Sequence, residues 1–219
     1  MKAHRLLFAV LATLPLSACE LIEKDDTDPP VLFNLGVETG TYDPQTRTAG
    51  AFVLDTALDS IFTEFGPEVP TFGWTYVLST GSDIVAPLSG KVSSLTFDDA
   101  SQTYEVRIRP KTDSVWVVTV GNVSLPLVAD GDTLAAGDDL GEAGGGGPLG
   151  YGMASLRVDD TDKDKSWCPF AVFDTATLLT VSSQLGTTLV QFETLKSDAT
   201  IYDEAAWFLP GCTSETVPY

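Results

Sequence analysis

The chain has 219 residues and is strongly acidic, because 12 lysines and arginines stand against 31 aspartates and glutamates and give a formal net charge of −19. Nucleic-acid binding needs clustered Lys and Arg side chains that displace counterions from phosphates, and the sequence holds no such run, so we exclude nucleic acid as a partner. The single histidine is His4. A chain without further imidazole lacks the commonest general base and the commonest metal ligand.

The first residues have the pattern of an export signal. Lys2 and Arg5 precede an apolar run from Leu6 to Leu16, and Ser17-Ala18-Cys19 follows. The run is too short to span a membrane, so we predict a signal peptide over residues 1–18. Residues 19–30 are acidic, end in two prolines, and are predicted to form a solvated tether. Removal of residues 1–18 takes away two cations and no acid, which changes the formal charge from −19 to −21.

Leu16-Ser17-Ala18-Cys19 also resembles the lipobox of bacterial lipoproteins. That resemblance implies that Cys19 is lipidated, becomes the new N-terminus and anchors the protein to a membrane of the cell envelope, facing the periplasm or the cell surface. The alternative is an ordinary secretory signal in which the cysteine is incidental.

Residues 31–170 are predicted to form one β-rich domain, because apolar, β-branched and aromatic residues recur in short runs between turn signals. The clearest predicted strands are 74–78, 90–97, 103–109 and 114–120. Residues 171–219 change character. Loosely helical apolar spacing predicts a helix over 174–195, and a second short helix is expected over 198–208, before Leu209-Pro210-Gly211.

Cys168 and Cys212 are the remaining cysteines. In an exported protein we expect these two cysteines to form a disulfide, which would hold the C-terminal extension against the domain.

Two glycine-containing stretches carry a family resemblance. Gly81-Ser-Asp-Ile-Val-Ala-Pro-Leu-Ser-Gly-Lys-Val92 and Ala129-Asp-Gly-Asp-Thr-Leu-Ala-Ala-Gly-Asp-Asp-Leu-Gly141 resemble strand-turn-strand motifs of the lysostaphin/LytM-type peptidoglycan endopeptidases. The same stretches recur in biotinyl/lipoyl-type folds. The resemblance implies a mainly β fold with a LytM-like, barrel-sandwich hybrid core, to which the C-terminal helical extension is added.

Active members of that family hold zinc with a His-x-x-x-Asp motif and a His-x-His motif, and a further histidine assists catalysis. When the spacing of these motifs is carried over to this sequence, Phe72 and Tyr76 fall at the first motif, Asn122 falls near the additional histidine, and Met153-Ala154-Ser155 fall at the second motif. None of these residues is a strong zinc ligand at neutral pH. We therefore expect no metal, no other cofactor and no catalytic residue from this frame.

Phe72, Tyr76, Asn122, Met153 and Ser155 are instead predicted to line a binding groove. The resemblance then implies a non-catalytic domain that binds peptidoglycan or regulates a cell-wall hydrolase. Two alternatives remain. One is a peptidoglycan hydrolase with a non-standard site, for which the sequence shows no Ser-x-x-Lys motif and no carboxylate spacing signature. The other is a structural surface lipoprotein.

Overall fold

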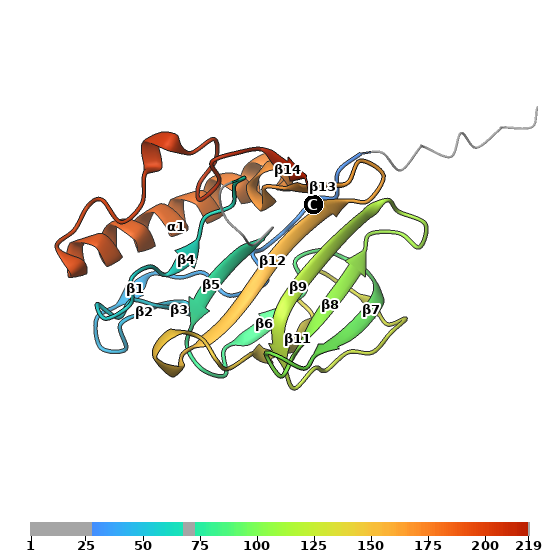
Figure 1. The fold of residues 1–219 in the computed structure, drawn as a ribbon, viewed down its shortest axis with the longest axis horizontal. Helices are drawn as coiled ribbons and strands as arrows, with labels where there is room; N and C mark the ends of the chain where they lie inside the picture. Colours follow the sequence, from blue (N-terminus) through green and yellow to red (C-terminus); the bar gives the residue numbers. More distant parts are fainter. Residues whose placement is uncertain (1–27, 68–72, 219) are drawn as a thin grey trace, which may run out of the picture.

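The computed structural model of the chain describes residues 28–67 and 73–218, and all strands within these ranges join one antiparallel sheet (Figure 1). The strands are β1 (Tyr42–Asp43), β2 (Thr48–Ala49), β3 (Phe52–Val53), β4 (Phe62–Thr63), β5 (Trp74–Leu78), β6 (Asp83–Val85), β7 (Gly90–Asp98), β8 (Thr103–Arg109), β9 (Trp116–Ser124), β10 (Thr133–Leu134), β11 (Asp139–Ala143), β12 (Gly152–Asp160), β13 (Lys165–Trp167) and β14 (Thr216–Pro218).

The main path of the sheet runs β1-β2-β3-β5-β12-β9-β8-β7-β10. Five further strands lie off this path: β4 pairs with β5, β13 pairs with β12 and β14, and β11 pairs with β6 and β9. The long strands β12 and β9 therefore form the centre, and β5 and β8 flank them. The predicted mainly β fold is confirmed, and the bounds of β5 and β8 coincide with two of the predicted strands.

Alternation of side chains decides which face of the central sheet is buried. Along β12, Ala154, Leu156 and Val158 are fully buried, and the residues between them face the other side. The same period of two continues in β5 and β9, where Tyr76 and Val118 lie on the buried face. We call the opposite side the open face, because the side chains of Met153, Ser155 and Arg157 on it remain partly exposed.

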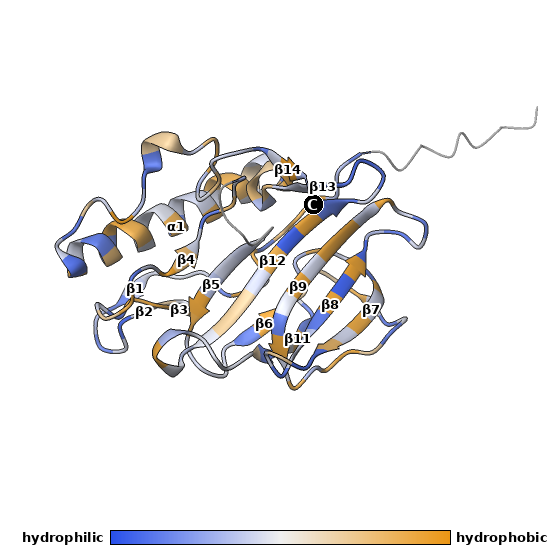
Figure 2. Cartoon of the chain, in the orientation of Figure 1, coloured by the Kyte–Doolittle hydropathy of each residue, from blue (hydrophilic) through white to orange (hydrophobic). Residues whose placement is uncertain are grey.

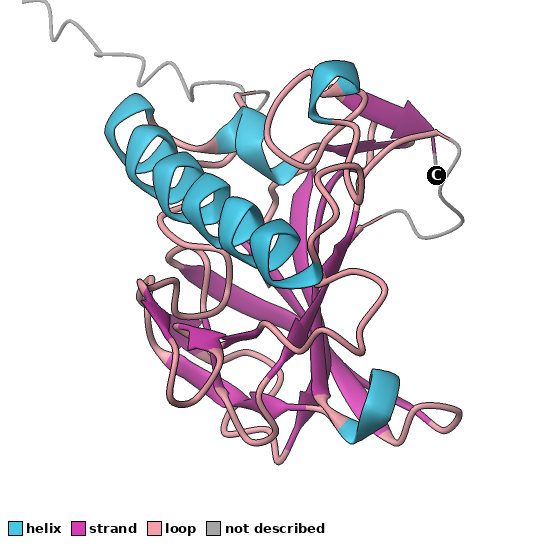
Figure 3. Ribbon diagram, turned by 90° about the vertical axis from the view of Figure 1, so that its left-hand side faces the viewer, coloured by secondary structure: helices cyan, strands magenta, loops and turns pink. Residues whose placement is uncertain are grey.

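One long helix, α1 (Thr175–Lys196), packs beside the N-terminal strands (Figures 1 and 3). Asp174 caps its start, since its carboxylate accepts hydrogen bonds from the backbone N–H groups of Ala176 and Thr177. The helix buries one stripe of residues at helical spacing, made up of Val181, Leu185, Thr188, Leu189 and Phe192. The predicted helix over 174–195 is confirmed.

The second predicted helix, over 198–208, is wrong. Only a short 3₁₀ turn, η3 (Glu204–Ala206), forms there. The physical reason is a tertiary anchor: Tyr202 is buried, stacks on Phe62 with ring centroids 4.5 Å apart, and accepts a hydrogen bond from the N–H of Ile61. Burial of this aromatic ring fixes the segment in a path that a helix would not follow.

Two further 3₁₀ turns are η1 (Pro148–Gly150), between β11 and β12, and η2 (Pro169–Val172), between β13 and α1. The predicted disulfide between Cys168 and Cys212 is present and joins Cα atoms 6.0 Å apart. Gly211 beside it has φ +68°, and a side chain there would collide with the indole of Trp74, so this position requires glycine. The predicted C-terminal extension over 171–219 also adds β14 to the sheet.

The predicted signal peptide over residues 1–18, Cys19 and most of the predicted tether lie outside the described residues. Within the part of the chain that the structure describes, no helix has the length and apolar character needed to cross a membrane.

Candidate functional site

A row of hydroxyl groups crosses the open face. In the register of the sheet, Thr63 of β4 lies opposite Thr75 of β5, Thr75 lies opposite Ser155 of β12, and Ser155 lies opposite Gly121 of β9. A side chain at position 121 would come within 2.4 Å of the Ser155 Oγ, so Gly121 leaves the space that this hydroxyl occupies. Within the described residues no hydrogen bond joins the hydroxyls of Thr63, Thr75 and Ser155 to another group, and each hydroxyl has both a donor and an acceptor function.

A groove of about 330 Å³ lies over one end of this row. Thr63, Thr75, Val77 and Met153 form its floor on the open face. Residues 57–60 form one wall, and Pro148 and Leu149 form the other. The lining mixes apolar side chains with the polar side chains of Asp59, Ser60, Thr63 and Thr75, a combination typical of pockets that take an organic ligand of mixed polarity.

A hydrogen bond between two side chains ties the walls together. The hydroxyl of Tyr151, just after η1, donates to Oδ2 of Asp55 at 2.6 Å, and the other carboxylate oxygen accepts from the N–H of Ala57 at 2.9 Å. These two bonds hold the pKa of Asp55 below its ordinary value, with the Tyr151 bond as the main cause. The same bond raises the pKa of the Tyr151 hydroxyl. An ionised Asp55 thus holds both walls in place.

Asn122 shapes the site through its backbone. It has φ +60°, a conformation that asparagine tolerates better than most residues. At this point β9 stops pairing with β12 and begins to pair with β11. The Asn122 carbonyl accepts from the N–H of Gly144 at 2.6 Å, and the Gly144 carbonyl accepts from the N–H of Met153 at 2.8 Å. Asn122, Met153 and Ser155 therefore lie close together on neighbouring strands, but of these three residues Met153 alone lines the groove.

Tyr76 does not join them. It lies opposite Ala154 on the buried face, is 1% exposed, and donates from its hydroxyl to the carbonyl of Leu35 at 3.1 Å. Burial raises the pKa of this hydroxyl well above its ordinary value. The predicted groove residue Tyr76 is thus a core residue, because its neighbours in β5, Thr75 and Val77, are the ones that face outward. Phe72, the fifth predicted groove residue, lies outside the described residues.

The site offers little for a metal ion or for proton transfer. Nowhere in residues 28–67 and 73–218 do three or more His, Cys, Asp or Glu side chains gather as potential metal ligands. Asp59 is the one ionisable side chain among the described residues that line the groove. Hydrolysis of the glycosidase type uses two carboxyl groups, and the described lining supplies one. The arrangement is suited to binding through hydrogen bonds and apolar contact.

Sequence reasoning missed Thr63, Thr75, Val77 and Leu149. Thr75 and Val77 could have been placed from the alternation of side chains along β5. If Trp74 and Tyr76 face the core, Thr75 and Val77 lie on the opposite face. No sequence signal placed Thr63 or Leu149, because β4 is two residues long and Leu149 lies in a glycine-rich loop.

No protein-family model and no curated protein sequence matches the chain. Among solved structures, the catalytic domain of the antimicrobial peptidase lysostaphin from Staphylococcus simulans matches at 16% identity, with 45% of this chain and 76% of that chain covered and a TM-score of 0.37. A zinc-containing peptidase from Vibrio cholerae matches at 18% identity, with 51% and 37% covered and a TM-score of 0.40.

Helicobacter pylori Csd3 matches at 16% identity, with 78% of this chain and 45% of that chain covered and a TM-score of 0.44. The chain thus spans less than half the length of the Vibrio and Helicobacter structures. These structures include lysostaphin-type peptidases, the group that the two glycine-containing stretches resemble in sequence.

Proposed function

We propose that the protein is a non-catalytic, LytM-like domain that binds peptidoglycan in the groove between β5 and β12 and is held at a membrane by a lipid on Cys19. The groove lining is the observation that carries this proposal. Two floor hydroxyls, those of Thr63 and Thr75, have no partner among the described residues and lie beside apolar side chains of both walls. Peptidoglycan consists of amide-linked peptides and sugars whose polar groups bond to hydroxyls and whose alkyl groups contact apolar surface.

The backbone of Leu149 supports a binding role for the groove. This residue has φ +57° and leaves 64% of its side chain exposed at the groove wall. A leucine with backbone angles in the left-handed region is strained. Because its side chain is exposed, it also contributes little hydrophobic stabilisation to the free protein. Contact with a ligand would remove this side chain from water, so the energetic benefit of its position comes on binding.

Two observations support binding without hydrolysis. His4 is the one histidine of the sequence and precedes the predicted cleavage site. At the place of a His-x-His motif the chain has Met153-Ala154-Ser155, in which Met153 lines the groove and Ser155 lies on the same face of β12, so that they offer a thioether and a hydroxyl. These groups are poor ligands for zinc at neutral pH.

The anchor rests on the sequence alone. Leu16-Ser17-Ala18-Cys19 combines a cleavage site with a cysteine that can carry a lipid. Replacement of this cysteine, Cys19→Ser, should move the protein from the membrane fraction to the soluble fraction of cells that export it, and membrane retention of the variant would contradict the anchor.

Co-sedimentation with peptidoglycan sacculi tests the proposed function. The purified protein is incubated with sacculi and added zinc, pelleted, and the supernatant is analysed for released muropeptides. We expect the protein in the pellet and no released muropeptides. Released muropeptides would contradict the non-catalytic role and favour a hydrolase. A protein that stays in solution without such release would contradict wall binding and favour a hydrolase partner or a structural role.

A matched pair of variants locates the binding surface. Leu149→Ser removes an exposed leucine from the groove wall, and Leu179→Ser removes an equally exposed leucine from α1, where 68% of that side chain is accessible. We expect Leu149→Ser to reduce the pelleted fraction and Leu179→Ser to leave it unchanged. Equal effects of the two substitutions would place the binding surface elsewhere.

A further inference from the structure

Three arginines meet on the open face, beyond the groove. Arg107 of β8 lies opposite Thr119 of β9, and Thr119 lies opposite Arg157 of β12. Arg109 follows two residues after Arg107 and therefore lies on the same face of β8. Two strand spacings separate β8 from β12, about 10 Å, so the guanidinium groups of the long side chains can reach one ligand across β9. We call Arg107, Arg109 and Arg157 the arginine cluster.

Each arginine is positioned by one contact that leaves other donors free. The Nε of Arg157 donates at 2.8 Å to the buried carboxylate of Asp159, whose other oxygen accepts from the hydroxyl of Ser166 at 2.6 Å. Arg109 donates from Nη1 to the carbonyl of Ser114. Among the described residues, Arg107 has one long contact, at 3.6 Å, to the half-exposed Glu105. A guanidinium carries five N–H donors, so each group retains several for a ligand.

A buried hydroxyl lies in the middle of the cluster. Thr119 is 3% exposed, and its Oγ1 finds no hydrogen-bond partner within the described residues. A buried polar atom without a partner is costly and calls for an explanation at that position. The register places it between Arg107 and Arg157, beneath the cluster, although Thr119 is not among the residues that line the pocket described next.

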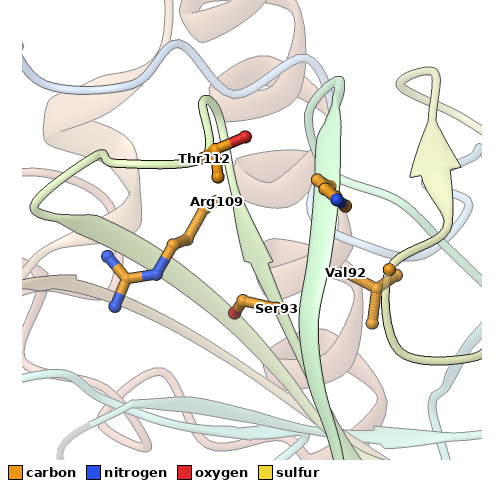
Figure 4. A pocket seen from close by; sticks show the side chains of 6 residues that line it. Val92, Ser93, Arg109 and Thr112 are labelled. Carbon is orange, nitrogen blue, oxygen red and sulfur yellow. The ribbon is translucent and has the colours of Figure 1, made fainter.

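The surroundings are cationic, although the whole chain is strongly acidic. A pocket of about 270 Å³ is lined by the arginine cluster together with Ser93, Ser94, Val117, Asp159 and Thr161. Arg109 and Ser93 also line an adjoining pocket of about 290 Å³, which Figure 4 shows with Thr112, and which adds Lys91. Four of the chain's 12 cationic side chains thus line these pockets, against one of its 31 acids. Figure 2 shows the hydrophilic bands on β8 and at the end of β12 beside β13.

We propose that the arginine cluster binds an oxyanion group, either a phosphate or a carboxylate. Guanidinium groups match the geometry of both groups, because two parallel N–H donors can bond two oxygens of one ligand. The Ser94 hydroxyl adds a further donor, whereas the hydroxyls of Ser93 and Thr161 already donate to the carbonyls of Arg107 and Val115. A partly buried position strengthens these bonds relative to an exposed surface, and the negative field of the rest of the protein disfavours weak, non-specific attraction of anions.

The arginine cluster and the groove share the open face of β12. Met153 and Arg157 are four residues apart on this strand, a distance of about 13 Å. One ligand with an apolar group and an anionic group could occupy both sites. The anion site does not depend on the proposed function, because its test uses free anions and reports on the cluster even if the protein does not bind peptidoglycan.

The experiment is calorimetric titration of the purified protein with inorganic phosphate and, separately, with citrate, at constant ionic strength. We expect at least one of the two anions to bind with a Kd of about 1 mM or tighter. Stronger binding of phosphate would identify a phosphate site, and stronger binding of citrate a carboxylate site. Values of Kd above roughly 1 mM for both anions would overturn the proposal.

Two glutamine variants distinguish binding at the arginine cluster from the general effect of removing one positive charge. Arg107→Gln removes the most exposed member of the cluster, and Arg47→Gln removes the same charge from the turn between β1 and β2, at the far end of the sheet. We expect Arg107→Gln to raise the Kd roughly tenfold or more, and Arg47→Gln to change it less than about twofold. Equal losses in the two variants would overturn the proposal. Unfolding curves of both variants establish that each remains folded.

Discussion

Removal of the disulfide between Cys168 and Cys212 has an effect that the structure allows us to calculate. The bridge closes a loop of 44 residues between two fully buried cysteines. The chain-entropy relation for such a loop gives a loss of about 4 kcal/mol in the free energy of unfolding when the bridge is removed. Small globular domains have total stabilities of roughly 5–15 kcal/mol, so the expected loss is a large part of the whole.

The variant Cys168→Ala/Cys212→Ala should nevertheless fold. Two backbone hydrogen bonds hold the same segment without the bridge: the N–H of Cys168 donates to the carbonyl of Glu215, and the N–H of Thr213 donates to the carbonyl of Phe65. Urea unfolding followed by tryptophan fluorescence measures the stability of the variant and of the oxidised parent. We expect a lower midpoint and a steeper m-value, because an unfolded chain without the bridge exposes more surface. A stability difference under about 1 kcal/mol would refute the loop-entropy argument.

Three further substitutions each test the role of one side chain. Tyr151→Phe removes the hydrogen bond to Asp55. That bond lowers the pKa of Asp55 in the folded protein below its ordinary value of 3.8. The bond therefore stabilises the folded state fully above pH 3.8, and this stabilisation is lost as the pH falls through the lower pKa of the folded state. Thermal unfolding should therefore separate the variant from the parent at pH 6, and the separation should vanish in acid; a separation that grows in acid would contradict this assignment. Tyr76→Phe should cost about 1 kcal/mol in urea unfolding, since a buried bond to the Leu35 carbonyl is lost, without any change in pelleting with sacculi; reduced pelleting would show that Tyr76 contributes to the groove after all. Asn122→Ala should cost about 1–2 kcal/mol because of its positive φ, whereas Asn122→Gly should cost little, and equal losses would contradict the backbone role of Asn122.

The elements of the fold follow from local sequence patterns where those patterns are strong. Trp74-Thr-Tyr-Val-Leu78 alternates large core residues with outward ones, and it forms β5 over the predicted bounds. Leu185, Leu189 and Phe192 recur at helical spacing and lie on the buried stripe of α1. The helix predicted over 198–208 does not form, because burial of Tyr202 against Phe62 outweighs the helix propensity of this segment.

The composition of the site depends on strand register and topology, which local patterns do not encode. A frame taken from spacing placed Tyr76 in the groove, but in a strand a shift of one residue moves a side chain to the opposite face. The arginine cluster was hidden for a related reason. Arg107 and Arg157 are fifty residues apart in sequence and meet because β9 lies between β8 and β12 in the sheet.

The most direct test of groove binding is a nuclear magnetic resonance titration of the isotopically labelled protein with soluble muropeptides. We predict that the largest shifts of backbone amide signals fall on the groove floor, at Thr75, Val77 and Met153, that smaller shifts occur on α1, and that the muropeptides remain intact throughout. Shifts concentrated away from β5 and β12, or cleavage of the muropeptides during the titration, would contradict the proposal that this sheet face binds peptidoglycan without hydrolysing it.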